Sequence, residues 1–249
     1  MPEHPSNNQY PVLYSDITVL NSHEHKSWRC KATDKMPWLK EKNLVPLTVD
    51  EFHLAQRRYP IVFSSADVPV PLALMALEPE QNAFVGGDGE AKAGIYIPAY
   101  ARRYPFLLAK LNPDSSELSL CFDRASGLVG PFEDGMPLFD KNTPSSECQR
   151  ILQFCQGFED AGSRTRTFVA ALLEYELLVE AETKVDVAGD ANSRVYNGFK
   201  IVDAAKLPNI QGQILQEWLK NGVLSSIFAH LSSLGIMSEL AERDGTQKS

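Results

Sequence analysis

The phrase Arg-Arg-Tyr-Pro occurs twice in this chain, at 57–60 and at 102–105, and an apolar run follows each copy. Proline disfavours helical geometry in the residue before it, so a helix must end at each copy. The apolar residues that follow predict a strand. The phrase therefore predicts one local transition, from helix to strand, that is used twice. An internal duplication is the alternative, although the residues on either side of the two copies align poorly.

The residues before the first copy carry a helix start signal. Thr48 and Glu51 have the spacing of a capping box, in which a hydroxyl and a carboxylate each satisfy a free backbone amide. The helix that follows must end before Pro60. The β-branched and aromatic residues 61–63 predict a strand, and the apolar segment 72–77 is either its hairpin partner or the next strand.

The residues around the second copy predict a similar order of elements. A short strand is expected at 82–85, and the glycine-rich segment 86–90 is a turn. A short helix over 98–103 begins at a proline, which favours the first helical position. The apolar segments 106–111 and 117–123 lie on either side of an Asn-Pro-Asp-Ser-Ser loop, which predicts a hairpin.

Beyond residue 140 the pattern becomes mainly helical. Ser145 or the adjacent serine can cap a helix whose apolar residues recur at helical spacing, and Gly-Ser at 162–163 is expected to interrupt it. Thr165 is expected to cap a second helix. Two further helices are predicted at 211–221 and 226–243, on either side of a glycine.

One strand pair is expected among these helices, at 181–188 and 195–202, joined by a Gly-Asp-Ala-Asn turn. Strands and helices are thus segregated along the chain, so we predict an α+β fold with a mainly antiparallel sheet in the N-terminal half and a helical C-terminal half. The predicted organisation is a flexible tail over 1–12, a single domain over 13–243 that is β-rich over 13–140 and helix-rich over 141–243, and a flexible tail over 244–249.

Composition limits the classes of partner. The 249 residues carry a formal net charge of −8, which argues against nucleic acid because phosphate binding needs a basic face. The first 20 residues have no basic segment leading into an apolar stretch, so no secretory signal is predicted. We also predict no membrane insertion, because no apolar window approaches the ~20 residues that a span requires. The expected location is the cytoplasm.

The cysteines and histidines do not form a recognisable metal site. None of the four cysteines makes a CxxC pair, and we interpret all four as reduced core residues. His23 and His25 have a spacing that metal sites sometimes use, but their charged neighbours favour a solvated loop. We therefore predict no metal and no cofactor.

His230 lies on an apolar helical segment and is the candidate general base, although a buried histidine with a backbone partner is the alternative. No nucleophile elbow and no phosphate-binding loop occurs in the sequence. No catalytic residue is assigned.

The arginines of the two phrases are the other candidates for recognition. If the two transitions lie side by side, up to four guanidinium groups could surround an anionic ligand. The alternative is architectural, because arginine in a last helical turn complements the helix dipole. The predicted ligand or anion site comprises Arg57, Arg58, Tyr59, Arg102, Arg103, Tyr104 and His230.

Several short motifs, in order over nearly the whole chain, resemble the SapC family of bacterial proteins, which is named for a surface-array protein transport component. The motifs are Tyr59-Pro60-Ile61-Val62-Phe63, Leu77-Glu78-Pro79-x-x-Asn82-x-Phe84-Val85, Arg102-Arg103-Tyr104-Pro105-Phe106, Leu120-Cys121-Phe122-Asp123, Pro137-Leu138-Phe139-Asp140 and Ala229-His230-Leu231-x-Ser233-Leu234. Phe228 stands where the family usually has tyrosine, so any role of that hydroxyl is absent here.

The resemblance implies a bacterial, cytosolic protein with a link to S-layer export. Relatives tend to be encoded beside TonB-dependent receptors and flavin-dependent halogenase-like enzymes. We therefore expect a non-catalytic accessory or binding protein of a cell-surface secretion or TonB-linked uptake system. The alternative is a peptide- or small-molecule-modifying, oxygenase-like enzyme. A protein partner is expected, and the wide apolar stripe of the last helix is either core or the interface of a homodimer.

Overall fold

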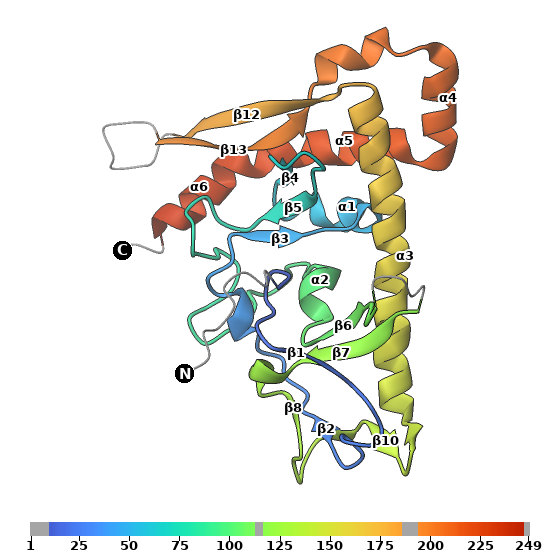
Figure 1. Ribbon diagram of the computed structural model, residues 1–249. Helices are drawn as coiled ribbons and strands as arrows, with labels where there is room; N and C mark the ends of the chain where they lie inside the picture. Colours follow the sequence, from blue (N-terminus) through green and yellow to red (C-terminus); the bar gives the residue numbers. More distant parts are fainter. Residues whose placement is uncertain (1–9, 113–116, 186–193, 247–249) are drawn as a thin grey trace, which may run out of the picture. The chain divides into compact units, whose positions relative to one another are not determined.

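Every strand pair that the described residues form is antiparallel, and the long helices lie in the C-terminal half, which confirms the predicted α+β class (Figure 1). The computed structural model describes residues 10–112, 117–185 and 194–246. The chain divides into two compact units, each made of two separate segments. Unit 1 comprises Met1–Asp34 and Arg103–Glu159, and unit 2 comprises Lys35–Arg102 and Asp160–Ser249.

Unit 1 is built from small antiparallel sheets and the first part of helix α3 (Ser146–Glu174). One sheet has the order β1 (Ile17–Val19), β7 (Ser119–Asp123), β6 (Phe106–Ala109). A second has the order β8 (Val129–Gly130), β2 (Arg29–Cys30), β9 (Met136–Pro137), and β10 (Phe139–Asp140) pairs with β11 (Thr143–Pro144). The 3-10 helix η3 (Arg124–Ser126) follows β7. The core of the unit contains Phe106, Phe122 and Leu138 together with three buried cysteines.

Unit 2 contains the largest sheet. Its strand order is β12 (Leu178–Val185), β13 (Arg194–Val202), β4 (Ile61–Ser64), β5 (Pro71–Leu74), β3 (Leu44–Pro46). The helices of this unit besides the second part of α3 are η1 (Pro37–Leu39), η2 (Val49–Glu51), α1 (Phe52–Ala55), α2 (Ala99–Arg102), η4 (Ala204–Asn209), α4 (Gly212–Asn221), α5 (Val223–Ser233), η5 (Leu234–Ile236) and α6 (Met237–Thr246). Helix α5 contacts β4, β13 and α1.

The local signals around the two phrases are confirmed. Thr48 and Glu51 form the predicted capping box: the Thr48 amide donates to Glu51 Oε2 over 2.9 Å. Helices α1 and α2 end before the prolines, and strands β4 and β6 begin after them. Strand β5 pairs with β4 as its hairpin partner, the first of the two alternatives expected for residues 72–77, and the predicted pairs β6–β7 and β12–β13 also form. The turn predicted at 189–192 lies outside the described residues.

The predicted break at 162–163 is wrong, because α3 continues without interruption from Ser146 to Glu174. Thr165 is not an N-cap. Its hydroxyl donates to the Ala161 carbonyl over 2.7 Å and accepts from the Val49 amide over 2.9 Å. A glycine inside a helix costs about 1 kcal/mol, which the buried face of so long a helix outweighs.

Two further predictions are corrected. Residues 82–85 form no strand, only an isolated antiparallel bridge between Val85 and Ala91. The Asn82 side chain instead fixes this segment locally, because its Nδ2 donates to the Leu39 and Lys42 carbonyls and its Oδ1 accepts from the Phe84 amide. The helix predicted at 226–243 is divided into α5, η5 and α6. At the division the Ser233 hydroxyl donates to the His230 carbonyl over 2.6 Å, a local bond that competes with regular helix geometry.

Candidate functional site

His230 bridges two strands of the unit 2 sheet. Strands β13 and β4 are paired through Phe199 and Ser64 and through Lys200 and Phe63, and the same antiparallel register places Val202 opposite Ile61. At this residue pair the His230 imidazole connects β13 to β4 in place of a direct backbone hydrogen bond. The Val202 amide donates to His230 Nε2 over 3.0 Å, and Nδ1 lies 2.8 Å from the Ile61 carbonyl, so the Nδ1–H tautomer satisfies both.

The same helix also binds the other backbone group of Ile61. The Ile61 amide donates to Ser233 Oγ over 2.9 Å. His230 and Ser233 lie on adjacent turns of α5 and are both fully buried, so helix α5 is attached to the end of β4 by polar contacts as well as by apolar packing. The Ala-His-Leu-x-Ser-Leu motif therefore has an architectural explanation.

These contacts argue against His230 as a general base. Burial lowers the pKa of the imidazole to about 4, although the bond to the Ile61 carbonyl opposes this shift. The ring is neutral at pH 7, but its acceptor nitrogen is already occupied by the Val202 amide. A reaction that used this nitrogen would first have to break the bridge between the strands.

In unit 2, two residues of the phrases meet at Tyr96. The buried Tyr59 hydroxyl donates to the Tyr96 carbonyl over 2.7 Å, and Arg102 Nη2 donates to the Tyr96 hydroxyl over 3.2 Å. The Tyr96 hydroxyl in turn donates to Glu51 over 2.9 Å. Burial and the nearby carboxylate of Glu51 raise the pKa of Tyr59, and the same causes raise the pKa of Tyr96 to about 12. Both phenols are therefore neutral and act as hydrogen-bond donors.

Arg57 and Arg58 follow α1 and are exposed. The Arg58 guanidinium lies beside Gly94, with Nη2 4.0 Å from the position of a Cβ on that glycine. The structure therefore brings Tyr59 and Arg102 together, while these two arginines stay at the surface. Whether the arginines bind an anion remains a prediction.

The remaining residues of the second phrase belong to unit 1. Arg103 is buried; its Nη1 lies 3.3 Å from Glu159 Oε1, and its guanidinium carbon lies 4.1 Å from the Phe158 ring centre. The Tyr104 hydroxyl donates to the buried Asp123 over 3.2 Å, and burial followed by this carboxylate raises the pKa of Tyr104. Both side chains are thus held inside unit 1, as packing elements.

The interpretation of the two histidines as a solvated loop is partly corrected, and the interpretation of the four cysteines as reduced core residues is confirmed. His23 is exposed, as expected for a loop, but His25 is buried and packs its ring edge-on against Trp28 and Phe122. The Asn21 amide donates to its Nδ1 over 3.1 Å. All four cysteines are buried without a disulfide, and burial raises each of their pKa values, to about 11 for Cys30. Across the residues that the structure describes, no three histidine, cysteine or acidic side chains come together as a metal site.

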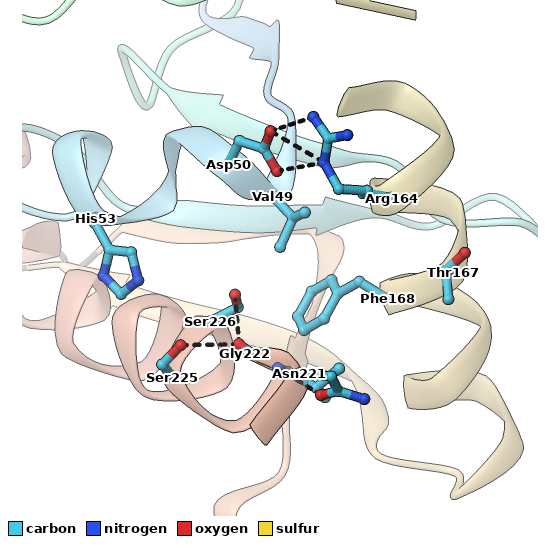
Figure 2. Close-up of a pocket in the computed structure, with 11 residues that line it drawn as sticks. Val49, Asp50, His53, Arg164, Thr167, Phe168, Asn221, Gly222, Ser225 and Ser226 are labelled. Carbon is cyan, nitrogen blue, oxygen red and sulfur yellow. Dashed lines mark hydrogen bonds and ion pairs between the residues drawn. The ribbon is translucent and has the colours of Figure 1, made fainter. Parts of the chain in front are cut away.

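Unit 2 contains a pocket of about 370 Å³ that the sequence does not point to (Figure 2). Three helical segments line it: η2 with the start of α1, the middle of α3, and the turn that leads into α5. Val49 and Phe168 supply apolar surface, and Figure 2 shows the Phe168 ring pointing into the pocket from α3 and the His53 ring pointing toward the first turns of α5.

An ion pair forms one wall of this pocket. Arg164 Nη2 donates to Asp50 Oδ2 over 2.6 Å, and Arg164 Nε lies 3.2 Å from both carboxylate oxygens. The bond to Asp50 raises the pKa of Arg164, and the Asp160 carboxylate adds to the effect. Both side chains are about half exposed, so the pair orients two planar polar groups at the pocket without adding net charge.

The opposite wall is the start of α5, where hydroxyl and amide groups are oriented by local bonds. Ser225 Oγ and Ser226 Oγ donate to the Gly222 carbonyl over 2.8 and 3.0 Å. The Val223 amide donates to Asn221 Oδ1 over 3.2 Å. Each serine oxygen therefore keeps lone pairs to accept a bond, and the Asn221 Nδ2 amide keeps its protons to donate.

Sequence reasoning missed this pocket because its walls are distant in the chain. Asp50 and Arg164 are separated by 114 residues. The one available signal was the capping box, which fixes the start of η2 and so the position of Asp50.

The chain is thus an α+β protein with a small pocket that is lined by helical segments of unit 2 and that combines apolar and polar side chains. The SapC family model matches residues 20–240, so the chain belongs to the SapC family. No curated protein and no solved structure matches the chain.

The C-terminal helices are apolar. Over Val223–Ala241 the helical segment is long and apolar enough to cross a membrane, by length and composition alone. A core helix has the same properties, and here Ile227, Ala229 and His230 are buried in the unit while Phe228 is 53% exposed. The predicted absence of membrane insertion and the predicted homodimer both remain predictions.

Proposed function

We propose that this chain is a non-catalytic accessory or binding protein that acts with a bacterial cell-surface secretion or TonB-linked uptake system. The observation that carries the proposal is the unit 2 pocket, whose polar groups are held in place but not activated. Its arginine is paired with Asp50, and the hydroxyl protons of Ser225 and Ser226 are committed to the Gly222 carbonyl. A nucleophile needs an adjacent base that accepts its proton, and here the serine protons go to a backbone carbonyl and not to the His53 ring at the same pocket.

Two further findings support binding rather than catalysis. Both nitrogens of His230 are bonded to backbone groups, and burial raises the pKa of every cysteine thiol, which disfavours the reactive thiolate. The chain belongs to the SapC family, and the proposed association with surface transport follows from the link of that family to S-layer export. We place the protein in the cytoplasm, where a net charge of −8 favours solubility.

Affinity capture from the bacterial host tests this proposal. A tagged chain, expressed at native level and crosslinked before lysis, is expected to enrich an envelope transport component that is accessible from the cytoplasm, such as an inner-membrane protein of a secretion or TonB-linked uptake system, identified by mass spectrometry. The tag alone is the background control. Enrichment of no envelope transport component above background would refute the proposed association.

A pair of variants connects the capture to the pocket. Ser225→Trp places a large side chain in the pocket, and Ser232→Trp makes the same change at an exposed position two turns further along the same helix, outside the pocket lining. Both variants should melt at the wild-type temperature. If the pocket serves the proposed function, the captured envelope transport component is lost from Ser225→Trp and retained by Ser232→Trp.

A further inference from the structure

We propose that the unit 2 pocket binds a neutral sugar, an assignment that rests on the proposed function and specifies the ligand class. The pocket volume of about 370 Å³ lies within the ~300–1,000 Å³ range of small-molecule sites. Its walls offer hydrogen-bond donors and acceptors, and its floor is apolar. A sugar is complementary to such a pocket, because its hydroxyls donate and accept hydrogen bonds while its C–H groups are apolar.

The charge around the pocket disfavours an anion. Arg164 is the guanidinium of the site, and it already binds the Asp50 carboxylate through Nε and Nη2. The Asp160 carboxylate also acts on this arginine. An incoming phosphate or carboxylate would therefore have to displace Asp50 from Arg164, in the field of a second carboxylate, Asp160. A neutral ligand meets no such repulsion.

The hydrogen-bonding groups match hydroxyl groups, which both donate and accept. Ser225 Oγ and Ser226 Oγ can accept, because their protons are bound to the Gly222 carbonyl. Asn221 Nδ2 can donate, because its Oδ1 already accepts from a backbone amide. The carboxylate, guanidinium, carboxamide and imidazole groups at the walls are all planar hydrogen-bonding groups, and those atoms of each that are not used by the Asp50–Arg164 pair or by Asn221 Oδ1 can bond the hydroxyls of a sugar ring.

The apolar floor and the helical walls complete the argument. Val49 is partly exposed and supplies most of the carbon surface on which the C–H face of a sugar ring can lie, and Phe168, which is 3% exposed, contributes only the part of its ring that reaches the lining. An extended peptide would instead need a strand edge to pair with. The pocket walls come from η2, α1, α3 and the turn before α5, so they offer no such edge.

Sugar binding to the purified full-length chain tests the inference. Glucose, xylose and maltose are titrated individually and followed by saturation-transfer NMR and calorimetry, with inorganic phosphate and glycylglycine as competing probes. At least one sugar should bind saturably to wild type and to Ser232→Trp but not to Ser225→Trp. His53→Ala should weaken binding about two- to tenfold, the effect of losing one hydrogen bond, and His23→Ala, another exposed histidine, should not.

The outcomes separate this inference from the proposed function. Saturable binding of no sugar, or binding of phosphate or glycylglycine at the pocket in its place, overturns the sugar assignment. Equal sugar binding by the two tryptophan variants also overturns it, because the sugar would then lie elsewhere. In each of these cases the proposed function is still tested separately, by whether affinity capture enriches an envelope transport component.

Discussion

Substituting His230 removes the bridge between β13 and β4, and its consequence can be estimated from the contacts. In His230→Leu the Val202 amide and the Ile61 carbonyl lose their side-chain partners in a fully buried position. Each buried polar group without a partner costs about 1–3 kcal/mol, so the expected loss of unfolding free energy is ~2–6 kcal/mol. His230→Gln keeps one donor and one acceptor and should lose less.

The same residue predicts an acid-dependent loss of stability. The pKa of His230 is lowered from 6.5 to about 4, so the unfolded chain takes up this proton more readily than the fold. Stability is therefore lost as pH falls below about 6.5 and levels off below about 4. Between pH 7.5 and pH 5 the linkage relation gives a loss of ~2 kcal/mol, and the full pKa difference corresponds to ~3.4 kcal/mol.

Urea unfolding at pH 7.5 and at pH 5 measures this effect in wild type and in His230→Gln. The wild type should lose about 2 kcal/mol more than the variant over this interval. His25, whose pKa burial also lowers, is present in both proteins, so its contribution cancels. An equal loss in wild type and His230→Gln would refute the assigned role of His230.

Three other substitutions or treatments test the remaining structure. Alanine at the exposed Arg57 and Arg58 should change the unfolding free energy by less than about 0.5 kcal/mol. Arg103→Ala should lower it by ~2 kcal/mol or more, because Arg103 is buried. Equal losses in denaturant unfolding would contradict the exposed and buried placement of these arginines. Gly89→Ala should cost ~1–3 kcal/mol, because Gly89 has φ +86° and its Cβ would lie 2.6 Å from the Pro37 nitrogen; an unchanged melting temperature would oppose this. A thiol reagent at pH 8 should modify the cysteines only after unfolding, because burial raises their pKa values; rapid native labelling would contradict their burial.

Local features were predictable from the sequence because they depend on neighbours in the chain. The Thr48–Glu51 capping box, the helix ends before Pro60 and Pro105, and the three hairpins follow from hydrogen bonds and backbone restrictions within a few residues. The break expected at 162–163 failed for a related reason. A glycine propensity of about 1 kcal/mol is a local quantity, and the tertiary packing of α3 outweighs it.

The roles of the candidate site residues were decided by tertiary structure. Sequence reasoning could place His230 on an apolar helix, but a ring bonded to Ile61 and Val202, 169 and 28 residues away, depends on how the sheet and helix meet. The pocket depends on a pair separated by 114 residues, Asp50 and Arg164. A periodic pattern shows which face of an element is buried. It does not show which distant polar group that face will meet, because that choice is made by the packing of the whole unit.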